Sequence, residues 1–267
     1  MKYFKLVSII LVGALFLLGC QDPSLPSPAL SSTVRSATVV FINAAPDGAA
    51  SQSFLVDNAS AASVNFPGGS ALTPINASIE QFRIKNAVYG IIKPDTISQK
   101  ADLISQTSAT AIQGSGHYTV VLTDSVNRPF GKTTATPYTK DPGGLTFTTI
   151  TDAITAPASG NAGIRFFNLA PGAASVYLTH DGGSTFTGLT SSAAYKKTSG
   201  SFTSIATGTY TLEVRTGSIT GTIAASLPST VLTDGKLYTI FLSGKVVKIG
   251  GNSVVKVPYA VSIVGHN

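Results

Sequence analysis

The residues that could do acid–base or metal chemistry are few and far apart in this sequence. The 267 residues include three histidines, which are His117, His180 and His266. Asp181-Gly182 is a hairpin turn signal, so we expect His180 to lie in solvent beside a turn. A zinc site needs several ligands held close together, and the spacing of the histidines provides no such pair. The sequence therefore predicts no metal site.

Hydrolytic chemistry has little more support. No G-x-S-x-G nucleophile elbow occurs, although a triad is set by geometry, so His180 with Asp181 and a distant serine stays open. Glu80 and Glu213 are the only glutamates, and most aspartates fall in turns, where capping explains them. Phosphate-binding glycine loops and calcium loops are missing from the sequence. We expect no catalytic residues and no cofactor, and leave open a calcium ion held by backbone oxygens.

The single cysteine has the clearest chemistry in the chain. Two lysines precede an apolar run from Leu6 to Leu18, which is shorter than the roughly 20 residues of a membrane-spanning helix and typical of a signal peptide. The run ends in Leu17-Leu18-Gly19-Cys20, which resembles the bacterial lipobox. We expect residues 1–19 to be a lipoprotein signal peptide and Cys20 to carry acyl chains such as palmitate. No thiol then remains for a disulfide.

The residues after the cysteine predict a spacer and a location. Residues 20–35 are rich in proline and serine, which favours an extended tether. Gln21 stands where the enteric inner-membrane retention signal has aspartate, which favours the outer membrane and leaves the leaflet open. The formal net charge is +6, but the basic residues are scattered, which argues against a nucleic-acid partner. The expected partners are the membrane, through the acyl chains, and envelope proteins or polysaccharide.

An internal repeat organises the rest of the chain. Residues 39–48 (VVFINAAPDG) match residues 164–172 (IRFFNLAPG), and residues 116–122 (GHYTVVL) match residues 236–242 (KLYTIFL). A weaker pair lies between them, at residues 92–97 and 205–210. Three matched segments in the same order indicate a tandem duplication.

Each copy has the pattern of short β-strands bounded by turn residues. Residues 118–123 and 238–243 alternate in the way a strand with one core face does. We therefore predict an all-β chain of two tandem immunoglobulin-like, Greek-key antiparallel β-sandwich domains, at residues 36–155 and 163–267, joined by a linker at 156–162. Tyr118 and Tyr238 are candidates for a tyrosine corner, in which the hydroxyl bonds to upstream backbone. The alternative is that both are simply half-buried aromatic residues.

These motifs resemble a known bacterial family. Phe41-Ile42-Asn43-Ala44-Ala45-Pro46 and Phe166-Phe167-Asn168-Leu169-Ala170-Pro171 are similar to its opening motif, Asp234–Thr239 to its closing motif, and Thr151–Pro157 to the segment that joins its tandem copies. The family is the domain of unknown function 4397. Gly172 and Gly114–His117 depart from its pattern at two turns. The resemblance implies an exported or lipid-anchored β-sandwich protein with no established activity.

We accordingly expect a lipid-anchored cell-envelope protein, not an enzyme, whose two modules are adhesive, scaffolding or ligand-binding. A polysaccharide-binding accessory protein is one alternative, and it would need exposed aromatic rings at one end of a domain. The other alternative is an extracytoplasmic hydrolase, which would need a cleft that unites His180 or His117 with a serine or a carboxylate.

Overall fold

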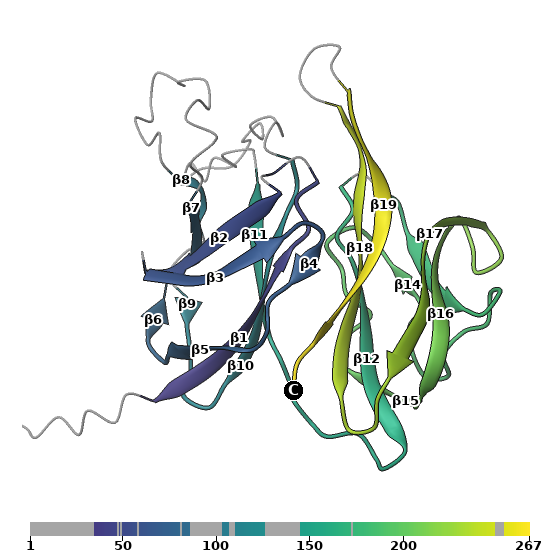
Figure 1. The fold of residues 1–267 in the computed structure, drawn as a ribbon, viewed down its shortest axis with the longest axis horizontal. Coiled ribbons are helices and arrows are strands. Elements are labelled where there is room, and N and C mark those ends of the chain that lie inside the picture. The colour runs from purple at the N-terminus through teal and green to yellow at the C-terminus, as the bar shows by residue number, and fades with distance from the viewer. Residues whose placement is uncertain are drawn as a thin grey trace, which may run out of the picture. The chain divides into compact units, whose positions relative to one another are not determined.

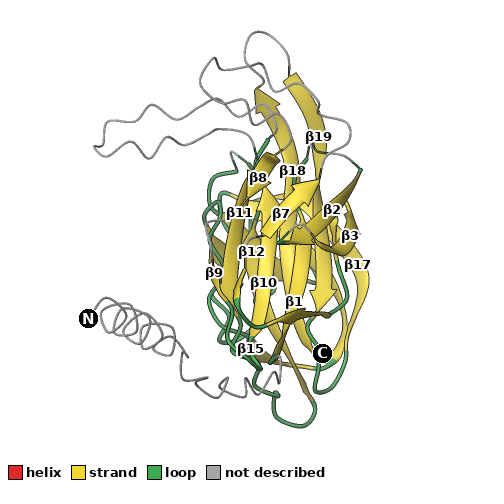
Figure 2. Cartoon of the chain, turned by 90° about the vertical axis from the view of Figure 1, so that its left-hand side faces the viewer, coloured by secondary structure: helices red, strands yellow, loops and turns green. Residues whose placement is uncertain are grey.

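A computed structural model describes residues 35–46, 48, 50–57, 59–80, 82–85, 103–106, 110–125, 145–171, 173–248 and 254–267. Strands and loops make up this part of the chain, and no helix occurs in it (Figure 2). Residues 35–267 form one compact unit. The predicted signal peptide, Cys20 and nearly all of the tether lie outside the described residues. The all-β prediction is confirmed.

Two sheets are built from the N-terminal half of this unit, residues 36–151 (Figure 1). Sheet A has the order β11-β10-β1-β4, and β5 also pairs with β1. Sheet B has the order β3-β2-β7-β8, and β6 and β9 pair separately. The strands are β1 (Ser36–Asn43), β2 (Ser51–Val56), β3 (Ala59–Asn65), β4 (Gly68–Gly69), β5 (Thr73–Asn76), β6 (Ile79–Glu80), β7 (Phe82–Lys85), β8 (Leu103–Gln106), β9 (Thr110–Ala111), β10 (His117–Thr123) and β11 (Thr146–Thr151).

The C-terminal half, residues 161–265, repeats this arrangement. Sheet D has the order β15-β12-β18-β19, and sheet E has the order β14-β13-β16-β17. The strands are β12 (Asn161–Asn168), β13 (Val176–His180), β14 (Ser192–Ala193), β15 (Thr203–Ala206), β16 (Gly208–Thr216), β17 (Thr222–Leu232), β18 (Leu237–Lys248) and β19 (Val254–Gly265). In both halves the first strand lies beside a strand that comes much later in the chain.

That long-range pairing corrects one feature of the predicted fold. β1 pairs with β10 in parallel, and β12 pairs with β18 in parallel, while the other strand pairs are antiparallel. Sheets A and D are therefore mixed, and not purely antiparallel as predicted from the sequence, whereas sheets B and E are antiparallel. A parallel neighbour must be reached by a long connection, and the intervening strands of the opposite sheet supply it in each half.

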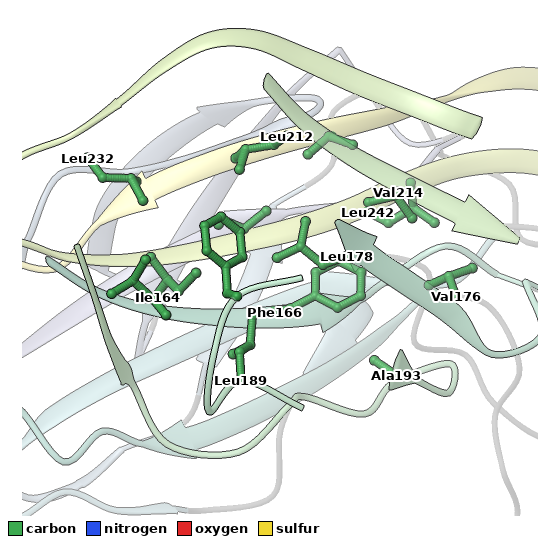
Figure 3. Packing of buried hydrophobic residues seen from close by; sticks show 14 of the residues in the cluster. Ile164, Phe166, Val176, Leu178, Leu189, Ala193, Leu212, Val214, Leu232 and Leu242 are labelled. Atoms are coloured by element: carbon green, nitrogen blue, oxygen red, sulfur yellow. The ribbon is translucent and has the colours of Figure 1, made fainter. Parts of the chain in front are cut away.

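Three clusters of buried apolar side chains lie between successive sheets. One fills the space between sheets A and B around Phe41, Phe54 and Phe82. A second lies between sheets D and E, where Phe166 of β12 and Leu178 of β13 meet (Figure 3). The third joins sheet A to sheet D and contains four residues of the N-terminal half and four of the C-terminal half: Val40, Ile42, Ala44, Val121, Phe167, Leu169, Phe241 and Val264.

Sheets A and D are consequently covered on both faces. Thr119 and Val121 of β10, which the alternation placed on a solvent face, are fully buried. Thr239 and Phe241 of β18 are buried in the same way. The expectation that these strands have a single core face is wrong, because each outer face packs against the other half of the chain.

Candidate functional site

A network of polar side chains lies buried between the two halves. The Arg165 guanidinium donates to Asp152 at 2.6 Å, to the Thr119 hydroxyl at 2.8 Å and to the Thr239 hydroxyl at 2.8 Å. Thr119 donates to Asp152 at 2.6 Å, and 2.7 Å separates the Thr239 hydroxyl from Nε2 of His266. Each hydroxyl thus accepts a hydrogen bond from Arg165 and can donate its own O–H to a second acceptor. The network is complete without an external ligand.

This network contains the side chains of a Thr-His-Asp triad, but its position suits a structural role. His266, Asp152 and Arg165 are at most 3% exposed as side chains, so a substrate has no access to Thr239. Burial, together with the nearby charges of Arg165 and His117, lowers the pKa of His266 from its ordinary value of 6.5 to about 3. Asp152 would favour a protonated imidazole at 3.5 Å, but its carboxylate is already paired with Arg165. His266 is therefore neutral in the folded protein.

The junction has a second polar contact at its opposite end. Asp124, which follows β10 in the N-terminal half, accepts a hydrogen bond from the Tyr195 hydroxyl and pairs with Lys196 at 2.5 Å. The Thr123 hydroxyl donates to the Leu169 carbonyl at 2.8 Å. These bonds link the strand ends of the two halves, as the Arg165 network links their other ends.

An open hollow lies in the C-terminal half at the end of β13. Its volume is about 280 Å³. The rings of His180, Phe186 and Tyr210 line it and contact one another, with centroid distances of 4.3 Å, 5.2 Å and 5.3 Å. Thr185, Thr187, Ser204, Ile205 and Ala206 complete the lining. The expectation that His180 lies in solvent is wrong in part, because its side chain is only 17% exposed and stacks on Phe186 in the lining of this hollow.

The turn beside the hollow is held by two carboxylates, the exposed Asp181 and the buried Glu213. Asp181 accepts the Thr211 backbone N–H at 2.8 Å and lies 3.1 Å from Nδ1 of His180. These two contacts lower the pKa of Asp181. Glu213 accepts the Gly182 backbone N–H at 3.2 Å and pairs with Arg215 at 2.6 Å. Burial would raise the pKa of Glu213, but these hydrogen bonds and the charge of Arg215 outweigh it, and the pKa is lowered.

The other sequence candidates are not brought together. His117 bonds the Thr38 hydroxyl at 2.6 Å through Nδ1, away from His180. Glu80 and Glu213 belong to different halves. Burial and the neighbouring Asp57 raise the pKa of Glu80 to about 7. Among the described residues, no cluster of three or more histidine, cysteine or acidic side chains could hold a metal, and no apolar helix has the length to cross a membrane.

Both tyrosine-corner candidates have the predicted kind of contact. The Tyr118 hydroxyl accepts the Gln113 backbone N–H at 2.8 Å, and the Tyr238 hydroxyl accepts the Thr233 backbone N–H at 3.4 Å. In each case the partner lies five residues upstream. Whether these bonds stabilise the fold stays a prediction.

Sequence reasoning overlooked the role of the asparagine in the repeated opening motif. Asn43 accepts the Ala45 N–H at 3.3 Å and donates to the Val64 carbonyl at 3.1 Å. Asn168 makes the equivalent pair of bonds, to Ala170 and to the Ala193 carbonyl, at 3.2 Å each. The Asn-x-Ala-Pro spacing was the available signal, since an asparagine side chain readily bonds to backbone two residues on. The motif closes the strand and tethers it to the opposite sheet.

The fold and these contacts define an all-β protein in which the repeated Asn-x-Ala-Pro motif ties a strand to the opposite sheet. Residues 37–179 match the family model described as Domain of unknown function (DUF4397), and the chain belongs to that family. The match covers the N-terminal half together with β12 and most of β13. No curated protein matches the chain.

Proposed function

We propose that the chain is a lipid-anchored protein of the cell envelope, in the outer membrane, with two non-catalytic immunoglobulin-like β-sandwich modules that bind or scaffold other molecules. One observation supports this proposal most. Thr119, Asp152, Arg165, Thr239 and His266 are all used inside a sealed contact between the halves. The hollow beside His180 is open, and no Lys, Arg, Asp or Glu is among its lining residues. These features leave the outer surfaces and the uncharged hollow as the places where another molecule could bind.

The anchor is tested at Cys20. In the natural host, the wild-type chain should incorporate radiolabelled palmitate and sediment with the outer membrane. Cys20→Ser should lose the label and move to the soluble fraction, while Ser24→Ala serves as a control in the same region. If the wild-type chain takes up no label and stays in the soluble fraction, the proposal of a lipid-anchored protein is overturned.

Exposure is tested separately by treating intact cells with a protease. Cleavage of the chain on intact cells would support an adhesive role at the surface. Protection on intact cells, together with cleavage after the outer membrane is opened, would exclude that role and leave scaffolding within the envelope.

A hydrolase is the second candidate, because the hollow meets the condition set for it. His180 lies there with Ser204, and Asp181 contacts Nδ1 of His180. A working nucleophile and base must be within hydrogen-bond reach of each other, and in the described structure no hydrogen bond joins Ser204 to His180. Hydrolysis of chromogenic esters that disappears in Ser204→Ala would establish the hydrolase.

A further inference from the structure

We propose that the hollow beside His180 binds one neutral sugar ring of a polysaccharide. This inference rests on the proposed function, because it gives the binding module a ligand class and a site. The argument uses the shape of the floor, the groups on the rim, the charge of the lining and the rigidity of the turn.

The floor and wall of the hollow are aromatic. His180 stacks on Phe186 with an interplanar angle of 29°, and Tyr210 stands edge-on to both rings, at 84° to His180 and 69° to Phe186. Phe186 is buried, while His180 and Tyr210 are partly exposed. A ring face carries partial negative charge, and weak hydrogen bonds from C–H groups to such faces are favourable. The apolar face of a pyranose offers such C–H groups.

The rim is made of small neutral hydrogen-bonding groups. Thr185, Thr187 and Ser204 are exposed and line the hollow. Nε2 of His180 has no partner among the described residues, because the contact to Asp181 uses Nδ1. Hydroxyls both donate and accept, so they suit a ligand that itself carries hydroxyls. The absence of charged side chains from this described lining favours a neutral ligand over an acidic one.

The volume limits the ligand to a single ring. Pockets for drug-sized ligands span about 300–1,000 Å³, and this hollow has about 280 Å³. Because it is open to solvent, the rest of a longer chain could leave it. A polysaccharide would then be held by one residue at a time, with the low affinity that suits multivalent attachment.

The site is formed in advance of binding. Tyr210 is fixed by its hydroxyl, which donates to the Ala206 carbonyl at 2.9 Å. The turn after His180 is held by Asp181 from one side and by the Glu213–Arg215 pair from the other. A rigid site avoids the entropic cost of ordering side chains on binding.

The test is saturation-transfer NMR on the purified full-length chain with methyl glucoside, methyl galactoside and N-acetylglucosamine as probes, and with glucuronate as the charged counterpart of glucose. At least one neutral sugar should give transfer, and glucuronate should bind more weakly than that sugar. Ala206→Met places a longer side chain in the hollow from an exposed position and should abolish the transfer. Ala111→Met makes the same change at an exposed residue in the other half and should leave it intact.

His180→Phe keeps a stacked ring and removes Nε2, together with the Nδ1 contact to the exposed Asp181. The affinity for the sugar should fall about tenfold, which corresponds to the loss of one hydrogen bond. No transfer from any neutral sugar, or equal transfer in Ala206→Met, would overturn the sugar site. If Cys20 is acylated in the same cells, the proposal of a lipid-anchored protein stands even though the sugar site is excluded. Cleavage of a probe glycoside by the wild-type chain would keep the sugar site and overturn the non-catalytic function.

Discussion

Two buried amides in the N-terminal half differ in whether their hydrogen bonds are made. Asn43 is fully buried and bonds backbone through both its oxygen and its nitrogen. Gln52 is 1% exposed, and both polar atoms of its side chain are unpartnered in the described part of the chain. A buried polar group without a partner costs free energy that an apolar side chain of suitable shape does not.

The C-terminal half shows which residue suits the position of Gln52. Gln52 lies opposite Val64, the residue whose carbonyl accepts from Asn43. In the repeat, Val176 lies opposite Ala193, whose carbonyl accepts from Asn168. Val176 is therefore the equivalent of Gln52, and it is fully buried in the core.

Gln52→Val should raise the free energy of unfolding by about 1 kcal/mol, because it removes two unpaired polar atoms. Asn43→Val is the matched control and should lower it by about 2 kcal/mol, because it strands buried backbone partners. Urea denaturation followed by circular dichroism measures both. A loss in Gln52→Val as large as that in Asn43→Val would show that Gln52 has a partner, such as an ordered water.

At the scale of the element, a tyrosine near the start of β10 and of β18 bonds upstream backbone. Tyr118→Phe should cost about 1 kcal/mol of stability, because it removes a hydrogen bond to backbone. Tyr238→Phe should cost less, because its bond is longer, 3.4 Å against 2.8 Å. Tyr177 is partly buried and its hydroxyl bonds no described residue, so Tyr177→Phe should be neutral in thermal unfolding. If all three changes behaved alike, the tyrosine corner would be wrong.

The sequence patterns predicted the presence of strands better than they predicted which strand faces are buried. Thr119 and Thr239 read as solvent-facing because threonine is polar, yet both are buried. Their hydroxyls are satisfied by Arg165, which lies on a third strand. Such a partner is distant along the chain, so local alternation could not reveal it. The near-continuous apolar run at Val39–Ile42 was the signal that both faces of β1 are covered.

The hollow was equally hard to foresee. The sequence indicated a turn after His180, which the structure has. It gave no sign that Phe186 and Tyr210 would contact the imidazole, because Tyr210 comes from the next strand of the sheet. Tyr210 is only partly buried and packs against the edge of the core between sheets D and E.

At the scale of the whole molecule, the buried ion pair joins the two halves. Arg165→Met alone should lower the free energy of unfolding by about 3–5 kcal/mol, because it leaves the Asp152 carboxylate buried and unpaired. Adding Asp152→Leu should recover a large part of this loss, since both charges are then absent. Chemical denaturation of the two single variants and the double variant measures the coupling. Additive losses would mean that the pair does not act as a unit.

The same junction makes stability depend on pH. His266 has a pKa of about 3 in the folded protein and 6.5 as the ordinary value. The unfolded chain therefore binds an extra proton below pH 6.5, and the free energy of unfolding should fall as the pH drops from 6.5 towards 3. The part due to His266 is on the order of 4 kcal/mol over this window. His266→Gln cannot bind the proton, and its stability should fall less steeply. Identical pH profiles for the two proteins would contradict a neutral, buried His266.

The contact between sheets A and D uses equivalent positions of the two copies. Ile42 and Phe167 each come one residue before the motif asparagine, and Val121 and Phe241 hold matching places in β10 and β18. A face that pairs with its own counterpart is used up once two copies have met. Repeats that stack head to tail can grow without limit. The contact between sheets A and D, in contrast, is complete with two copies. A third copy fused to the chain would find no vacant counterpart and would leave its own apolar face in water.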